Sequence, residues 1–292
     1  MVKKHTKNYF LYNIFVCVTV LIFFSSANAK DAHLNELEGN VVLIPAGSFL
    51  FGTNKKDDSA EALSLGLPKA WYADEGPEEN IFLKEFYIDR YEVTNRRYKI
   101  YIDDLNAVAP EYWVNKKFPV GQDKFPVVNV NWYDASNFCQ WAEKKLPSEK
   151  QWEKAARGET GNPYPWGKDF NSSYANLSSK SGSKNSLAAV GSYPKSATPF
   201  GVSDLVGNAW EWTEDDYNPY KESTYQNKNF GKGFKVLRGQ SAKNIGHFPG
   251  TTYLLALKMF ARSGYREFSN PEHSALDVGF RCVSSEMPKA MK

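Results

Sequence analysis

The sequence predicts an irregular α+β domain of low secondary-structure content, in which long loops are held by buried aromatic rings. Regular hydrophobic periodicity is weak along the chain. Ring-bearing and turn-forming residues are frequent, with eight Trp, 17 Tyr, 19 Phe, 20 Gly and 15 Pro. Rings bury large areas and Gly and Pro interrupt regular elements, so this composition does not suit a helical bundle or a parallel sheet.

Strands are expected near the start of the domain. Residues 41–44 and 48–51 flank Pro45-Ala46-Gly47, a pattern that predicts two short strands around a turn. Residues 82–89 are apolar and β-prone enough to predict another strand.

Three short helices are expected next. Thr94 is placed to cap the first, the second starts near Asp134, and Ser148 with Gln151 forms a capping box for the third, which Gly158 ends. Their apolar faces are predicted at Tyr98, Tyr101, Ile102 and Leu105, at Ala135, Phe138, Cys139 and Ala142, and at Trp152, Ala155 and Ala156.

The first 29 residues have the pattern of an export signal. Lys3, Lys4 and Lys7 precede an apolar run at 10–24, and Ala27-Asn28-Ala29 provides a small-x-small cleavage site. An uncleaved membrane anchor is the alternative, although the run is shorter than a spanning helix requires. We expect cleavage before Lys30, no stable membrane insertion afterwards, and a periplasmic or secreted protein.

Charge and length bound the mature chain. Removing the three lysines of the signal from the 36 basic residues leaves 33, which equals the 33 acidic residues. A neutral balance argues against nucleic acid as the main partner. We expect one domain over residues 37–285, followed by a C-terminal tail at 286–292.

Two cysteines remain after cleavage, Cys139 and Cys282. In an oxidising compartment an even pair is more often a disulfide than a catalytic thiol, and two free buried thiols are the alternative.

An ordered set of motifs gives the chain a family resemblance. The motifs are Val42-Leu43-Ile44-Pro45-Ala46-Gly47-Ser48-Phe49, Asp74-Glu75-Gly76-Pro77, Tyr91-Glu92-Val93-Thr94-Asn95, Lys145-Leu146-Pro147-Ser148-Glu149, Gln151-Trp152-Glu153, Gly207-Asn208-Ala209-Trp210-Glu211-Trp212, Leu237-Arg238-Gly239, Ala261-Arg262-Ser263 and Val278-Gly279-Phe280-Arg281-Cys282. In this order they closely resemble the formylglycine-generating-enzyme (sulfatase-modifying factor) family from residue 41 to 283. The resemblance implies a single compact domain related to the C-type lectin fold.

The cysteines of that family's chemistry are missing. In the formylglycine-generating enzyme, two cysteines that bind copper lie between an Arg-Gly-Gly-Ser block and the Ala-Arg-Ser block. The matching stretch, from Arg238 to Ser263, contains no cysteine and begins Arg238-Gly239-Gln240-Ser241. Thiolate ligation of a soft metal is therefore unavailable in this stretch, and we expect neither copper nor formylglycine generation. Cys139 and Cys282 match a structural pair of the family, which implies a disulfide between them.

The resemblance also implies calcium. A structural ion would be held by Asp204, Gly207, Ala209 and Glu211, and the alternative is that Asp204 caps a turn while Glu211 pairs with an arginine. A second site would use Asn176 and the Leu177 carbonyl, but its downstream aspartate is replaced near Gly182.

Residues of a substrate groove are implied in the same way. Trp210, Ser241, Arg262 and Arg266 match positions that border it, and the alternative for Trp210 and Arg262 is a core ring and a structural ion-pair partner. His247 and Glu267 are the candidate catalytic side chains. The histidines left after cleavage form no His-x-x-x-His pair, so the three-histidine iron centre of some relatives is not expected.

Two functions are compatible with these residues. The first is an exported maturation enzyme that oxidises a periplasmic peptide, protein or siderophore-type substrate, as the resemblance to the pyoverdine-maturation branch implies. The alternative, favoured by resemblance to the family's inactive paralogues, is a non-catalytic module that binds a peptide, a glycan or an envelope protein.

Overall fold

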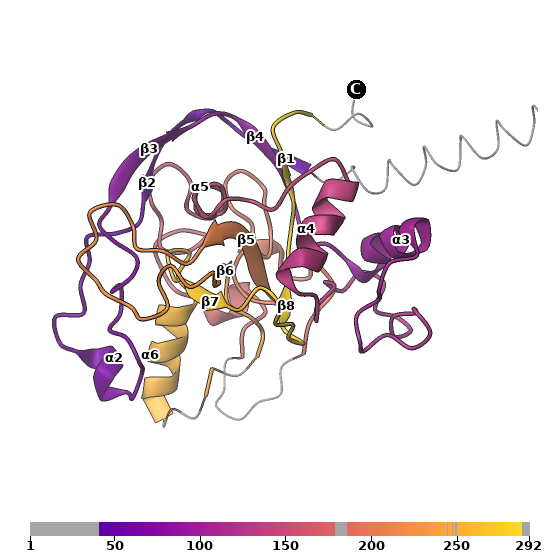
Figure 1. Ribbon diagram of the computed structural model, residues 1–292. Helices are drawn as coiled ribbons and strands as arrows, with labels where there is room; N and C mark the ends of the chain where they lie inside the picture. Colours follow the sequence, from indigo (N-terminus) through magenta and orange to yellow (C-terminus); the bar gives the residue numbers. More distant parts are fainter. Residues whose placement is uncertain (1–40, 179–185, 244, 247, 249, 288–292) are drawn as a thin grey trace, which may run out of the picture. The chain divides into compact units, whose positions relative to one another are not determined.

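The computed structural model describes residues 41–178, 186–243, 245–246, 248 and 250–287 (Figure 1). A compact unit runs from Val41 to Glu286, one of two into which the chain divides. The predicted export signal, most of the predicted tail, His247 and Gly182 lie outside the described residues. None of the described helices has the length and apolar character needed to cross a membrane.

The described strands form three small sheets. Their bounds are Val41–Ile44 (β1), Gly47–Phe51 (β2), Glu79–Leu83 (β3), Phe86–Asp89 (β4), Trp210–Asp216 (β5), Lys235–Arg238 (β6), Glu267–Ser269 (β7), Val278–Gly279 (β8) and Val283–Ser284 (β9). The sheet orders are β1-β4-β9, β2-β3 and β7-β6-β5-β8. All neighbours are antiparallel except β5 and β8.

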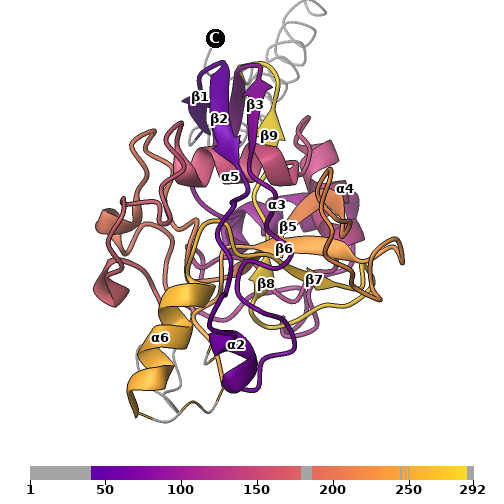
Figure 2. The ribbon, with the colours of Figure 1, turned by 90° about the vertical axis from the view of Figure 1, so that its left-hand side faces the viewer.

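The predicted strand at 82–89 is two strands in the structure. β3 pairs with β2 and β4 pairs with β1, so the chain changes sheets between Leu83 and Phe86. On the partner side the change occurs at Pro45, where Lys154 donates to the carbonyls of Pro45 and Gly47 at 2.7 and 2.9 Å. Figure 2 shows these strands gathered at the end of the unit opposite to α2 and α6.

The three predicted helices are present. Their bounds are Asn95–Leu105 (α3), Trp132–Trp141 (α4) and Glu149–Arg157 (α5). The α3 cap is Thr94 and the α5 capping box is Ser148 with Gln151, as predicted. The second helix starts two residues earlier than predicted, because Asn131 and Asp134 form its capping box.

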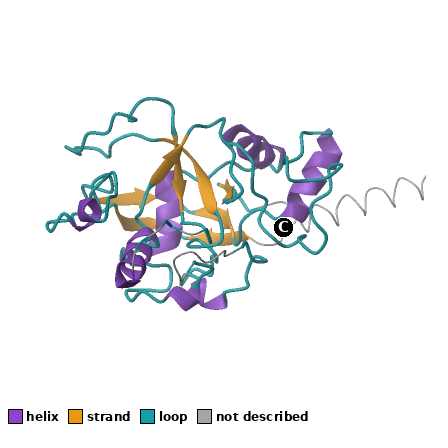
Figure 3. Cartoon of the chain, turned by 90° about the horizontal axis from the view of Figure 1, so that it is seen from below, coloured by secondary structure: helices purple, strands orange, loops and turns teal. Residues whose placement is uncertain are grey.

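Two further helices were not predicted. They are Glu61–Ser64 (α2) and Gly250–Phe260 (α6), which lie side by side in Figures 1 and 2. Short 3-10 turns occur at Ser172–Tyr174 (η1) and Pro194–Ser196 (η2). Loops make up much of the described chain (Figure 3), which confirms the α+β class of low secondary-structure content.

An aromatic cluster encloses the disulfide. Cys139 on α4 is bonded to Cys282 just before β9, and both side chains are fully buried. The Phe138 ring stacks on Tyr98 and meets Phe280 edge-on, with centroids 5.5 and 5.4 Å apart. The bond thus joins α4 to the residue that precedes the last strand, inside the core.

Candidate functional site

Arg262, a predicted groove residue, is buried in an ion pair with Glu75. Two of its nitrogens donate to the Glu75 carboxylate at 2.5 and 2.7 Å, and Nε donates to the Met259 carbonyl at 3.0 Å. Its guanidinium also lies 4.1 Å from the centroid of the Tyr72 ring. The structure therefore gives Arg262 the ion-pair role that the sequence left as the alternative.

Arg266 is enclosed in the same way. Its Nε and Nη2 donate to Glu149 at 2.6 and 3.0 Å, and Nη1 donates to the Asp74 carbonyl at 2.7 Å. Glu149 also accepts from Arg238, which in turn pairs with Glu153. All three guanidinium nitrogens of Arg266 thus donate to framework groups, and its place at the border of a groove stays a prediction.

Trp210 and Ser241 are linked by hydrogen bonds to a shared partner, Asp277. The Ser241 hydroxyl donates to the Asp277 carboxylate at 2.9 Å, and the Trp210 amide donates to the Asp277 carbonyl at 2.9 Å. Ser241 is buried, whereas Trp210 is half-buried and its ring lies 6.2 Å from that of Tyr265. Of the four predicted groove residues, Trp210 keeps the most accessible surface.

Glu211 and Arg281 form a fully buried pair. Arg281 donates from Nη2 and Nε to the two carboxylate oxygens of Glu211, each at 2.7 Å. The indole nitrogen of Trp152 adds a third donor at 2.8 Å. Both oxygens of Glu211 therefore have donors.

Two more carboxylates lie near this pair. Asp204 accepts from the Gly191 amide at 2.6 Å and from the Ser196 hydroxyl at 3.2 Å. Glu92 accepts from Asn208 at 3.0 Å through Oε1, while its buried Oε2 has no partner among the described residues. Burial, followed by the charge of Asp204, raises the pKa of Glu92 well above its usual range, and burial also raises the pKa of Asp204.

A hollow of about 490 Å³, which we call the Glu267 hollow, is lined by residues of three segments. The loop after α2 contributes Leu67, Pro68, Lys69 and Trp71, and the loop after β5 contributes residues 225–229. The stretch from the end of α6 into β7 contributes Phe260, Tyr265, Glu267 and Phe268. Three of the rings form a continuous wall, since Phe260 meets Trp71 and Tyr265 edge-on with centroids 5.3 and 5.0 Å apart. The Tyr265 ring also contacts the ring of Trp210, which lies outside the lining of the hollow.

Lys69 and Glu267 bring charge to the Glu267 hollow. Lys69 donates to Asp74 at 2.8 Å and to the Arg266 carbonyl at 2.7 Å, and its nitrogen lies 4.7 Å from the centroid of the Tyr265 ring. Glu267 accepts from the Phe268 amide at 3.1 Å and more weakly from the Tyr265 hydroxyl at 3.4 Å. Burial raises the pKa of Glu267, although the positive charge of Lys69 opposes the rise.

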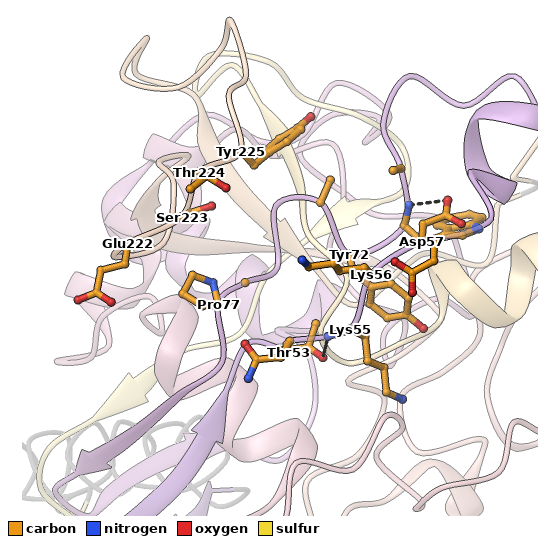
Figure 4. A pocket seen from close by; sticks show the side chains of 16 residues that line it. Thr53, Lys55, Lys56, Asp57, Tyr72, Pro77, Glu222, Ser223, Thr224 and Tyr225 are labelled. Carbon is orange, nitrogen blue, oxygen red and sulfur yellow. Dashed lines mark hydrogen bonds between the residues drawn. The ribbon is translucent and has the colours of Figure 1, made fainter.

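A second hollow of about 440 Å³ shares Trp71 and Tyr225 with the first. Figure 4 shows the loop at 222–225 on one side of it and Lys56, Asp57 and Tyr72 on the other. The Asp57 carboxylate is hydrogen-bonded to the start of α2, since it accepts from the amides of Glu61 and Ala62 at 2.9 Å.

Comparison with known proteins identifies the family. The profile described as "Sulfatase-modifying factor enzyme 1-like domain" matches residues 26–286. The chain belongs to this family. It is 30% identical to the inactive C-alpha-formylglycine-generating enzyme 2 of Mus musculus, over 84% of this chain and 85% of the mouse protein. It is 28% identical to the formylglycine-generating enzyme of Bos taurus, over 85% and 75% of the two chains.

Solved structures show the same fold. The structure of PvdO from Pseudomonas aeruginosa superposes with a TM-score of 0.62 at 25% identity, covering 84% of this chain and 94% of PvdO. Treponema denticola variable protein 1 superposes with a TM-score of 0.60 at 20% identity, covering 84% and 95%. The sulfatase-modifying-factor fold, related to C-type lectins, is thus that of this chain.

The carboxylates of the first implied calcium site have partners inside the protein. Asp204 and Glu211 both have donors inside the protein, which is the arrangement of the alternative reading. Among the described residues no three His, Cys, Asp or Glu side chains form a metal-binding group. Calcium at Asp204, Gly207, Ala209 and Glu211 stays a prediction, and the unpartnered Glu92 oxygen is one that a cation would satisfy.

The second implied site is partly described. Asn176 donates to Asn208 and to the Ser186 carbonyl at 3.0 and 3.1 Å, and its own carbonyl accepts from the Asn208 amide at 3.0 Å. Gly207 is required beside it, because a Cβ there would lie 2.7 Å from that carbonyl. Leu177 is buried next to it, and calcium at this position stays a prediction.

Sequence reasoning selected Glu267 but missed the residues around it in the Glu267 hollow. Lys69, Trp71 and Tyr225 are far from Glu267 along the chain and fall outside the family motifs. The clue available was an aromatic residue in each of two polar loops, since such rings need a wall to pack against.

Proposed function

We propose that the protein is an exported, atypical member of the sulfatase-modifying factor family that binds a periplasmic peptide, protein or siderophore-type compound. One observation carries the proposal. The buried framework of the family fold is complete, with Arg238, Arg262 and Arg281 all paired, while the stretch from Arg238 to Ser263 has no cysteine. The chain has the family's buried framework but lacks the thiols of its chemistry, which supports ligand recognition as its function.

The surface that we propose for recognition comprises Trp210 and the Glu267 hollow. Buried and half-buried rings form a wall beside one carboxylate, two lysines and the amide side chains of the 225–229 loop, and an aromatic wall with polar groups at its edge is a common composition of a ligand site. The name of the mouse relative, an inactive enzyme, supports the same reading. Calcium enters as a proposed structural ion only.

Site-specific crosslinking tests this proposal. A photoreactive amino acid at Tyr225, in the hollow, is expected to give a discrete adduct in the periplasm. The matched position is Val108, which is 82% exposed in the connection between α3 and α4. Equal adducts at both positions, or none at Tyr225, would sink the proposed surface.

Oxidative maturation of the bound compound is the second candidate. The similarity to PvdO, which spans 94% of that chain, favours it. Oxygen uptake that depends on a bound substrate would support it. Conversion of a peptide cysteine to formylglycine in the presence of copper would contradict both candidates, because each supposes that this chemistry is absent.

A further inference from the structure

The Glu267 hollow has a charge arrangement that the framework does not explain. Every buried arginine described above has a carboxylate partner, and Lys69 is neutralised by Asp74. Glu267 forms no ion pair within the described part of the chain, and it lies among five rings that line the same hollow. The rings belong to Trp71, Tyr225, Phe260, Tyr265 and Phe268.

From this arrangement we propose that the Glu267 hollow binds an alkylammonium group, with the Glu267 carboxylate as counter-ion and the aromatic wall against the ligand's methylene groups. Aromatic faces attract cations through their quadrupole, and the attraction is strongest in sites shielded from water. Burial removes part of the water that stabilises a carboxylate's charge. A ligand cation paired with the carboxylate compensates for that lost stabilisation.

Lys69 already shows that a cation is accepted here. Its ammonium nitrogen lies over the Tyr265 ring, and two of its N–H groups are taken by Asp74 and the Arg266 carbonyl. Lys69 is therefore poorly placed to hold a ligand anion. Lys228 lines the hollow as well but is exposed, where water and salt screen its charge.

The inference deepens the proposed function by giving the chemical class of the ligand. Two sources supply the same group: a lysine side chain of a bound peptide, or a free amine. Both are probed by small compounds, so the test does not depend on knowing the natural partner.

The experiment is a ligand-observed NMR titration of the mature protein with n-butylammonium, 1-butanol and butyrate, which share a similar chain and differ in charge. We expect n-butylammonium to bind about tenfold more tightly than either of the others. Nα-acetyl-lysine methylamide then separates the two sources, because a site for a peptide lysine should bind it more tightly than n-butylammonium, whereas a site for a free amine should bind n-butylammonium at least as tightly.

Variants assign the binding to the hollow. Glu267→Gln keeps the shape and the acceptor for the Phe268 amide, and it should abolish the preference for n-butylammonium over 1-butanol. The matched control is Glu272→Gln, which removes an exposed carboxylate nearby and should change nothing. Tyr225→Leu, in a partly exposed loop, should weaken n-butylammonium binding several-fold without affecting the core, and it serves if Glu267→Gln folds poorly.

Three outcomes would overturn the inference. These are equal binding of 1-butanol, tighter binding of butyrate, and unchanged n-butylammonium binding in the Glu267→Gln variant. Tighter binding of butyrate would leave the proposed recognition surface standing, whereas failure of the Tyr225 crosslink would count against that surface and not against the ammonium chemistry.

Discussion

Arg262 and Glu75 illustrate how single residues hold this loop-rich domain. The two side chains are 187 positions apart, and both are almost fully buried. A buried pair contributes little net stability compared with an apolar replacement of both partners, but each partner depends strongly on the other.

Removing one partner is therefore predicted to be severe. Arg262→Leu should lower the free energy of unfolding by about 3–5 kcal/mol, because it leaves the Glu75 carboxylate buried and unpaired. Urea unfolding measures the change. The control is Lys145→Ala, in a pair with Glu214 whose side chains are 56% and 49% exposed. That loss should stay below about 1 kcal/mol, and a similar loss in both variants would contradict the role given to Arg262.

Glu267 predicts a pH dependence of known sign. Its pKa is higher in the folded protein than the ordinary value of 4.5, so the folded state binds this proton more readily than the unfolded chain does. Ionised Glu267 thus opposes folding above its raised pKa, and the penalty disappears as pH falls below the ordinary value. Glu267→Gln should stabilise the protein at pH 8 and have no effect below about pH 4. Thermal unfolding at both pH values measures this, and stabilisation confined to acid would show that the sign is wrong.

Individual site residues could be predicted only in part. Trp210 was selected from a motif position and Glu267 as an acidic residue near the implied groove, and both lie against Tyr265. Arg266 was selected as a position that borders the family's groove, yet its guanidinium lies inside the framework while its neighbour Glu267 lines the hollow. A motif gives the position of a residue along the chain, whereas the direction of its side chain depends on neighbours that are distant in sequence.

Helix α5 shows the same dependence at the scale of an element. It carries Glu149 and Glu153, which bind Arg238 and Arg266, and Lys154, which closes the break between β1 and β2. The bonds to Arg238, to Arg266 and to the break between β1 and β2 therefore all depend on the position of α5.

The capping box of α5 offers a mild perturbation. Ser148→Ala removes the acceptor for the Gln151 amide and should cost about 1 kcal/mol of stability. Ser148→Asn, which can still cap, is the matched control and should recover most of the loss. Chemical denaturation measures both, and an equal loss in the two variants would place the effect outside the cap.

Helices with recognisable caps could be predicted from sequence, and two others could not. Helix α2 has four residues and its N-terminal amides bind Asp57, which precedes it by several positions. Helix α6 is apolar on much of its surface and begins at Gly250, so neither a cap nor a clear polar face marks it. The strand at 82–89 was divided because each half has a different partner strand, a fact that local propensity does not contain.

At the scale of the whole molecule, the order of motifs was sufficient to predict the fold class and the disulfide. The motifs contain Arg238, Arg262 and Arg281 together with the glutamates that pair with them in the core. The hollows could not be predicted, because they form between loops that lie far apart along the chain.

The disulfide is predicted to stabilise the whole domain. Cys139 and Cys282 are separated by 143 positions, so the bond removes a large amount of freedom from the unfolded chain. The loop-entropy relation gives about 4–5 kcal/mol. Unfolding by urea with and without reductant measures it for the wild type, with a Cys139→Ser/Cys282→Ser variant as the control that reductant should not affect. Equal stability of the wild type in both conditions would contradict the prediction.

The long-range pairs also determine when folding can finish. Glu75 and Glu149 precede their arginines by 187 and 117 positions, and β4 has to wait for β9. If the chain crosses a membrane with its N-terminus first, these carboxylates remain in water without their arginine partners until the last third of the chain has crossed. Completion would come only with release of the C-terminus, so a chain truncated before Arg238 is expected to remain unfolded and open to proteases.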